Sequence, residues 1–270
     1  MAEPAGKSAP HAIVEKDGPV VIVTMNRPER KNALSGEMLA LMADAWKLID
    51  EDPDVRVGIL TGAGGAFCAG ADLKEMAGGR ETNEFSKRFL EDPDLQWKGL
   101  LRHHRLKKPL IAAVEGYAVA GGTEILQATD IRVAGAGATF GVAEVRRGLF
   151  PVGGSTVRLR RQIPYTLAAE ILLTGRMVPA EEALRIGLIG RVVPDGQALA
   201  EARKIAAQIA ENGPIAVQAV LRSLRETEGM TEKDALQREL EIGIPVFATE
   251  DAREGPRAFA EKRTPTFKGR

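Results

Sequence analysis

The chain has 270 residues, of which 44% are hydrophobic and 27% charged, which is ordinary for a soluble globular protein. Lysine plus arginine and aspartate plus glutamate each number 37, so the formal net charge is zero, which argues against a nucleic acid or a membrane surface as the partner. The single cysteine excludes an intrachain disulfide and favours a cytoplasmic location.

The N-terminal segment, residues 1–10, is small and polar, and we expect it to form a disordered tail. It lacks the apolar stretch of a signal peptide and the arginine-rich pattern of a transit peptide. No apolar run in the chain approaches the length of about 20 residues that a membrane span needs.

The first third of the chain predicts a strand, a helix and a second strand. Residues 19–25 are rich in valine and isoleucine and end in a polar turn, which indicates a strand. From Ser35, a residue type that often caps helices, apolar residues recur at spacings of three and four, which predicts a helix. A second strand is expected at 55–60. A glycine-rich loop, 61–70, follows it, and another helix is expected to begin near Ala71.

The same order then recurs. A charged helical segment is predicted over about 81–106 and leads into a buried strand at 110–114. A second glycine-rich loop, 115–122, follows this strand, and a helix is expected at 123–129. Two short strands are predicted next, at 131–134 and 139–141.

From residue 153 onward the pattern is mostly helical, with prolines separating the helices. The chain therefore predicts an α/β core over 11–200 and a helical C-terminal region over 201–270. A helical region with so few aromatic residues favours a second surface to complete its core, hence oligomerisation. The C-terminal helices are expected at 198–210, 215–225 and 232–246.

The two glycine-rich loops predict a pair of backbone donors. Glycine lets a loop turn sharply and bring its N–H groups close to a ligand. A helix that follows leaves its first N–H groups unpaired at the positive end of its dipole. Two such loops side by side could aim the amides of Ala71 and Gly121 at one oxygen, as an oxyanion hole does for a thioester or acyl carbonyl. The alternative is two tight turns of an ordinary α/β fold.

Two glutamates in apolar surroundings predict acid–base chemistry. Glu124 lies just past the second glycine-rich loop, and Glu144 follows 20 residues later. Burial raises a carboxyl pKa, and a second carboxyl nearby raises one of the two further. One ionised and one protonated carboxyl can act as base and acid on the same water. Alternatively, each glutamate serves only as a helix-dipole partner.

Other motifs are absent or incomplete. Residues 148–155 nearly match a phosphate-binding loop, but Gly154 stands where that motif requires lysine. There is no Gly-x-Ser-x-Gly nucleophile elbow, and the three histidines lack the spacing of metal ligands, so no metal site is expected. The basic run of Arg158, Arg160 and Arg161 is interpreted as a solvated helix face.

Five stretches carry a further pattern, within a match that extends from Val20 to Lys268. They resemble the crotonase, or enoyl-CoA hydratase/isomerase, superfamily. The resemblance implies a core of repeated ββα units arranged as a spiral, with a helical C-terminal region that packs trimers, and hexamers made of two trimers. The stretches are 26–34, 66–73, 108–118, 121–124 and 254–263.

The resemblance also implies roles for the residues above. Members with glutamate at both positions are typically hydratases, which add water across the C2=C3 bond of a trans-2-enoyl-CoA. Glu124 would activate the water oxygen, Glu144 would exchange the proton delivered to C2, and the amides of Ala71 and Gly121 would hold the thioester carbonyl. No cofactor is implied, because coenzyme A is part of the substrate. The implied CoA-binding residues are Arg27, Ala33, Ala69, Asp72, Leu73 and Lys74, with Phe259 and Lys262 donated by a neighbouring subunit.

The sequence departs from the usual family pattern at Ala120 and Thr123, and at two arginines after Glu144. The stretches 125–127 and 157–164 look most like actinobacterial hydratases of steroid side-chain degradation. The predicted function is therefore enoyl-CoA hydration in fatty-acid or steroid side-chain β-oxidation. Three alternatives stay open: an enoyl-CoA isomerase, a non-catalytic acyl-CoA-binding protein and a thioester hydrolase.

Overall fold

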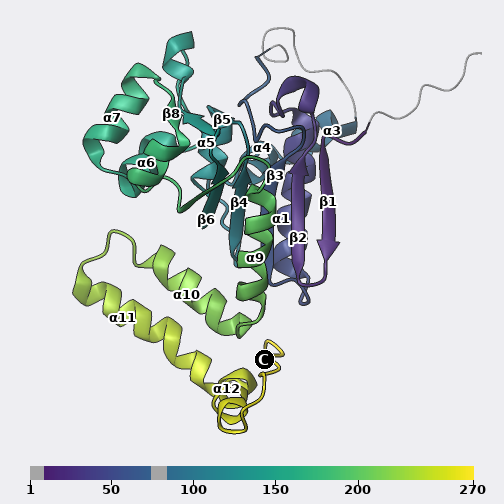
Figure 1. Cartoon of the computed structure of the whole chain (residues 1–270), viewed down its shortest axis with the longest axis vertical. Coiled ribbons are helices and arrows are strands. Elements are labelled where there is room, and N and C mark those ends of the chain that lie inside the picture. Colours follow the sequence, from purple (N-terminus) through teal and green to yellow (C-terminus); the bar gives the residue numbers. More distant parts are fainter. Residues whose placement is uncertain (1–8, 74–83) are drawn as a thin grey trace, which may run out of the picture.

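The computed structural model describes residues 9–73 and 84–270, and these residues form two sheets flanked by helices (Figure 1). The large sheet has the order β1-β2-β3-β4-β6-β9, in which β1 and β2 pair antiparallel and the other neighbours pair parallel. Its strands are β1 (Ala12–Asp17), β2 (Val20–Met25), β3 (Val57–Gly62), β4 (Leu110–Val114), β6 (Ile131–Gly135) and β9 (Arg191–Val193). The small sheet contains β5 (Tyr117–Val119), β7 (Thr139–Gly141) and β8 (Val178–Pro179).

The described helices cover both faces of the large sheet and continue into a C-terminal group. In chain order they are α1 (Gly36–Glu51), α3 (Glu84–Glu91), α4 (Leu95–Gly99), α5 (Gly121–Leu126), α6 (Ser155–Gln162), α7 (Tyr165–Thr174), α8 (Ala180–Arg185), α9 (Ala198–Ala210), α10 (Pro214–Glu226), α11 (Glu232–Gly243) and α12 (Glu250–Ala260). Short 3₁₀ helices lie at Pro28–Arg30, Glu144–Arg147 and Ile244–Ala248.

The central strands β2, β3 and β4 are largely buried on both faces, which explains their nearly continuous apolar sequences. In β2, Val21 and Val23 face the core that includes α1, whereas Ile22 faces the core under α9. The predicted helix after Ser35 is confirmed, since the Ser35 hydroxyl accepts a hydrogen bond from the amide of Met38 at 3.1 Å.

Several sequence-based element predictions needed correction. The single helix expected over 81–106 is wrong within the described residues, because α3 and α4 are separate and residues 100–106 are not helical. Pro93 between them removes a backbone donor and disfavours a continuous helix. The second glycine-rich loop was expected to be irregular, but it contains the short strand β5. This strand pairs with β7 and fixes the middle of the loop.

The C-terminal helices α10, α11 and α12 form an arm that extends away from the sheets (Figure 1). The expected boundary at residue 200 falls inside α9, which packs on the large sheet, and the division into two regions stays a prediction. Residues 1–8 of the expected tail lie outside the described residues. No helix in the described ranges is both long and apolar enough to cross a membrane.

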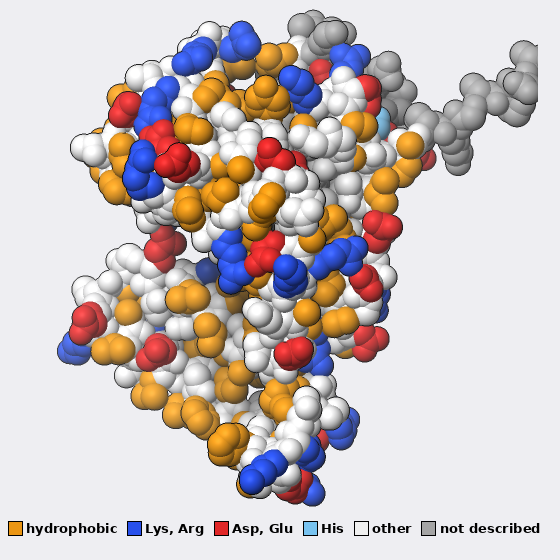
Figure 2. All heavy atoms as spheres, viewed as in Figure 1, with side chains coloured by type: hydrophobic (Ala, Val, Ile, Leu, Met, Phe, Trp, Pro, Cys, Tyr) orange, Lys and Arg blue, Asp and Glu red, His pale blue; other side chains and the backbone are white. Residues whose placement is uncertain are grey.

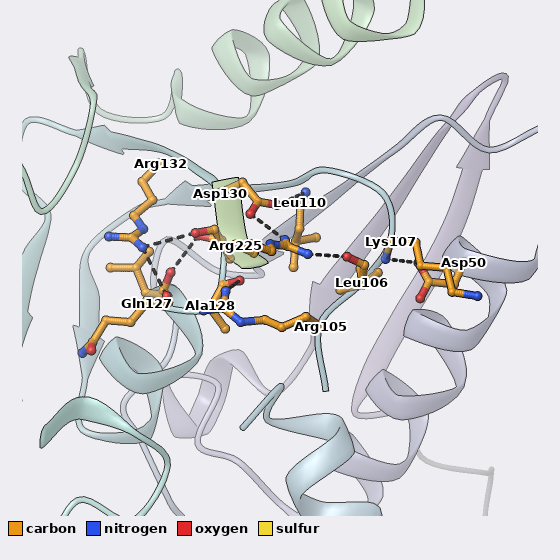
Figure 3. A network of polar contacts seen from close by, with 12 residues as sticks. Asp50, Arg105, Leu106, Lys107, Leu110, Gln127, Ala128, Asp130, Arg132 and Arg225 are labelled. Carbon is orange, nitrogen blue, oxygen red and sulfur yellow. Dashed lines mark hydrogen bonds and ion pairs between the residues drawn. The ribbon is translucent and has the colours of Figure 1, made fainter. Parts of the chain in front are cut away.

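The arm is anchored to the core through Arg225 on α10 (Figure 3). Its guanidinium donates to Asp130 Oδ1 at 2.6 Å and also to the carbonyl of Leu106. The other carboxylate oxygen of Asp130 accepts the amide of Leu110, the first residue of β4, at 2.9 Å. One ion pair therefore connects the arm to the strand that leads into the second glycine-rich loop.

Candidate active site

A cavity of about 1050 Å³ opens between the two glycine-rich loops, α4 and the segment that follows β7. The four residues predicted for catalysis all line it: Ala71, Gly121, Glu124 and Glu144. The rest of its wall is largely apolar, so a polar reaction centre adjoins an apolar compartment. Apolar residues of the wall include Leu39, Trp97, Leu100, Leu149, Phe150 and Val152.

The two loops approach each other closely at the predicted donor pair. A Cβ placed on Gly121 would lie 3.7 Å from the nitrogen of Ala71, and one on Gly70 would lie 2.7 Å from the Cβ of Ala120. Gly70 also has φ +94°, so a side chain there would be strained as well as crowded. The structure therefore brings the two amides side by side at the cavity wall.

The backbone around Ala71 directs its amide away from the chain. The N–H of Leu34 donates to the carbonyl of Gly70 at 2.8 Å, and the carbonyl of Leu34 accepts the amide of Asp72 at 3.2 Å. In the described part of the chain, no acceptor is bonded to the amide of Ala71 or of Gly121. Ala120, just before Gly121, has φ +52°, which is unusual for a residue with a Cβ and typical of strain held at functional sites.

Glu124, in the first turn of α5, is almost fully enclosed, with only 4% of its surface exposed. Its Oε1 accepts the amide of Ser155 at 3.3 Å. Burial raises the pKa of Glu124, and this rise is opposed by hydrogen bonds from the amides of Ser155, Gly153 and Gly154 and by the positive charge of Arg158. The carboxylate therefore faces the N-terminal end of α6, where a negative charge is favoured.

Glycines make this approach possible. A Cβ on Gly153 would come within 2.5 Å of Glu124 Oε2, and Gly154 has φ +122° as the residue that caps α6. The near-match to a phosphate-binding loop is thus explained in part, because this stretch does present amides to an anion. The anion is the carboxylate of Glu124, and we call residues 153–155 the carboxylate loop.

Glu144 has a different environment. It begins the 3₁₀ helix Glu144–Arg147, is half-buried, and its Oε2 is buried with no hydrogen-bond partner in the described part of the chain. Burial raises the pKa of Glu144 to about 7, and the charge of Glu124 adds to the rise. The charges of the two carboxyls thus interact across one cavity, and Glu144 holds its proton to a higher pH than an exposed glutamate does.

Comparison with known proteins shows the family of the chain. Residues 15–270 match the family model described as enoyl-CoA hydratase/isomerase. The chain belongs to this family. It is 57% identical to enoyl-CoA hydratase EchA19 of Mycobacterium tuberculosis over 98% of both chains. It is also 35% identical to 2,3-dehydroadipyl-CoA hydratase of Escherichia coli, over 96% of this chain and 98% of that one.

Solved structures confirm the expected crotonase fold. The crystal structure of an enoyl-CoA hydratase from M. tuberculosis matches with a TM-score of 0.88 and 41% identity, covering 97% of this chain and 100% of that one. An enoyl-CoA hydratase from Bacillus anthracis matches with a TM-score of 0.88 and 37% identity, covering 96% of this chain and 100% of that one. The assembly of the C-terminal region stays a prediction.

The residues expected from the family resemblance to bind CoA fall into two groups. Arg27 donates to the Ala33 carbonyl at 2.8 Å and pairs with Asp72 Oδ2 at 3.0 Å, which joins the stretch 26–34 to the residues just after the first glycine-rich loop. Asp72 also lines the cavity, together with Ala69 and Leu73. Lys74 lies outside the described residues.

The second group lies elsewhere. Phe259, on α12, is 86% exposed, and Lys262 follows the end of that helix. Neither lines the cavity of its own chain as the described residues form it, and α12 lies at the far end of the arm (Figure 1).

Sequence reasoning missed one charged residue behind the site. The solvated face predicted for the basic run is correct for Arg160 and Arg161 but wrong for Arg158, which is 8% exposed. Its Nη2 donates to the carbonyl of Leu101 at 2.7 Å and to that of Arg102. The available signal was the spacing of Arg158 three residues after Ser155 in a helix, which places both on the inner face.

Proposed function

We propose that the protein is an enoyl-CoA hydratase, which adds water across the C2=C3 bond of a trans-2-enoyl-CoA to give a 3-hydroxyacyl-CoA. The observation that carries this proposal is the pair of unlike carboxyls, Glu124 and Glu144, on one cavity beside two amides without acceptors. The hydratases among its relatives, one of them 57% identical, support the same reaction.

Each group then has one task. The thioester carbonyl accepts hydrogen bonds from the amides of Ala71 and Gly121. Ionised Glu124 takes a proton from water as its oxygen bonds to C3, and the electron pair of the alkene moves onto the thioester as an enolate. Protonated Glu144 gives its proton to C2, so one hydroxyl and one hydrogen are added. Two fixed donors stabilise the enolate oxygen. In other enzymes, the loss of one such donor raises the activation free energy by about 3 kcal/mol.

We propose that the coenzyme A part of the substrate lies along the loop edge where Arg27 and Asp72 pair. Phe259 and Lys262 would reach this site from a neighbouring subunit. We expect no cofactor besides the coenzyme A that arrives with the substrate, and we place the protein in the cytoplasm. The described residues that we propose to bind coenzyme A are Arg27, Ala33, Ala69, Asp72 and Leu73, and we propose the same role for Lys74, which lies outside the described residues.

The assembly that we propose is a homotrimer or a dimer of trimers. Large hydrophobic side chains on the arm are exposed, and Figure 2 shows hydrophobic side chains gathered along it. Contiguous apolar surface of this kind is typical of an interface. The exposed side chains include Val220 (61%), Leu224 (69%), Leu236 (56%), Ile244 (58%) and Phe247 (79%).

The acyl group that we propose comes from fatty-acid or steroid side-chain β-oxidation. The cavity of about 1050 Å³ and its apolar wall offer room for a bulky hydrophobic acyl group. The test is incubation of the purified protein with short, long and steroidal enoyl-CoA thioesters, followed by mass spectrometry. A gain of one water with at least one of them supports the proposal, and no gain with any of them overturns it.

Three further measurements with the same substrates separate the alternatives. An isomerase needs one carboxyl to move a proton between carbons, so Glu144→Ala would leave it active, whereas the hydratase loses most of its rate. A binding protein would take up the thioester and leave the enoyl absorbance unchanged. A hydrolase would release free CoA thiol.

A further inference from the structure

Arg158 is a buried cation at the back of the active site. It lies on α6, one turn after the carboxylate loop, and its side chain reaches the carbonyls of Leu101 and Arg102. Burial lowers the pKa of Arg158 to about 10, so the guanidinium still carries its charge at neutral pH. A buried charge is costly unless something compensates it.

The guanidinium is only partly compensated where it lies. Among the described residues it forms no salt bridge, and its buried Nη1 has no hydrogen-bond partner. Besides Glu124, the charged groups that act on it are Arg102, Arg105 and Glu228. Glu228 is also shared with another cation, because its Oε1 lies 3.7 Å from Arg161. The negative charge that remains to offset Arg158 inside the core is that of Glu124.

The position of Arg158 aims its charge at the carboxylate loop. A Cβ on Gly154 would lie 3.4 Å from Nη1 and 3.5 Å from Cζ, so the guanidinium packs directly against this loop. The same loop also binds Glu124, whose Oε1 accepts the amide of Ser155. The loop thus contacts both a buried cation and a buried carboxylate.

We propose that Arg158 is a positioning residue that acts through residues 153–155 to keep Glu124 ionised, and so decides which of the two carboxyls is the base. This inference rests on the proposed hydratase function. The charged groups that act on Glu124 are Arg158 on one side and Glu144 across the cavity. Among the described residues, no cation lowers the pKa of Glu144 in the same way, so the proposal leaves Glu144 as the proton donor.

The consequence for pH dependence has a definite sign. The positive charge lowers the pKa of Glu124 against the rise caused by burial. Neutralising Arg158 therefore raises that pKa and reduces the ionised fraction of Glu124 at acid pH. Activity should be lost at acid pH and recovered as pH rises, because a base works only in its ionised form.

The test compares Arg158→Gln with Arg158→Lys in pH profiles of kcat/KM for hydration. For Arg158→Gln we expect a loss of about tenfold at about pH 6 and of about twofold or less at about pH 8, relative to the unmodified enzyme. Arg158→Lys keeps the charge but cannot span both carbonyls, so its profile should keep the original shape even where its stability falls.

Arg132→Gln is the matched control. Arg132 is also a buried arginine, 9% exposed, and it donates to the carbonyls of Leu188, Gln127 and Thr129. Figure 3 shows Arg132 beside Gln127. Its loss should lower stability without moving the acid limb. A uniform loss of rate in Arg158→Gln at all pH values, like that of Arg132→Gln, would make Arg158 a structural anchor only and overturn the proposal.

A second readout does not depend on activity. Carbon NMR of glutamate carboxyls follows the titration of Glu124, whose resonance is identified by its disappearance in Glu124→Gln. In the unmodified protein Glu124 must ionise at lower pH than Glu144, and in Arg158→Gln it must ionise at higher pH than before. The reverse order, or an unchanged titration, overturns the proposal. A protein that shows this titration but hydrates no enoyl-CoA overturns the proposed function alone.

Discussion

The two carboxyl regions of the cavity are built in opposite ways. Glu124 lies in a helix, is enclosed by the amides of the carboxylate loop and has a buried cation behind that loop. Glu144 lies at the start of a single 3₁₀ turn, and one of its oxygens is buried without a partner among the described residues. The contrast teaches that chemically identical side chains acquire different environments from the groups packed around them, and in the proposed mechanism these environments assign the roles of base and acid.

The largest effect should follow from removing either carboxyl. Glu124→Gln and Glu144→Gln are each expected to lower kcat for hydration about 10³-fold, because each removes a proton transfer that the other residue cannot supply. Steady-state kinetics with one enoyl-CoA measures this. If one variant keeps full activity, that glutamate carries out no essential proton transfer, and the proposed roles of the two carboxyls are wrong.

A smaller effect is expected from disturbing the carboxylate loop. Gly153→Ala places a Cβ where Glu124 Oε2 now lies, at 2.5 Å, and should lower kcat about 100-fold by displacing the carboxylate. Gly243→Ala is the matched control, because a Cβ at Gly243 meets nothing within 4 Å. Equal activity of both variants would mean that the loop does not position Glu124.

The alkaline limb of the pH profile tests the other region. In the proposed mechanism Glu144 donates a proton and must therefore be protonated, and burial raises its pKa to about 7. We therefore expect kcat/KM to fall about tenfold for each pH unit above that pKa. A profile that keeps rising well above neutral pH would contradict the assignment of Glu144 as the acid.

The smallest effect on chemistry should come from the anchor of the arm. Arg225→Met removes the bonds to Asp130 and Leu106 and should lower the free energy of unfolding by about 2 kcal/mol. Denaturant unfolding measures this loss. The acid and alkaline limbs of the pH profile should not shift, because neither Glu124 nor Glu144 contacts Arg225. A shift of either limb would show that the different environments of the two carboxyls depend on distant parts of the fold.

Much of the fold could be predicted from sequence, and the reasons are physical. Strands such as β4 are buried on both faces and read as apolar runs, and Ser35 caps its helix through a local hydrogen bond. Strand β5 has only three residues and depends on its pairing with β7. This contact is long-range, so the local sequence pattern could not predict it.

The candidate site likewise had residues that the sequence could predict and one that it could not. The glycine-rich loops and the two glutamates were visible as local patterns, and the structure brings all four predicted residues to one cavity. Their roles remain a proposal. The burial of Arg158 was not visible, because its neighbours Leu101 and Arg102 lie more than 50 residues away along the chain. A basic run on a helix shows its charge but not which member turns inward.

Hydration of a trans-2-enoyl-CoA in D₂O, with the product returned to ordinary water and analysed by mass spectrometry and NMR, tests the central claim most directly. The account predicts a 3-hydroxyacyl-CoA that has gained one water and retains one carbon-bound deuterium at C2, delivered from Glu144. A 3-enoyl-CoA product without added water, which has lost a hydrogen from C4 and gained a deuterium at C2, or the release of free CoA, would contradict it.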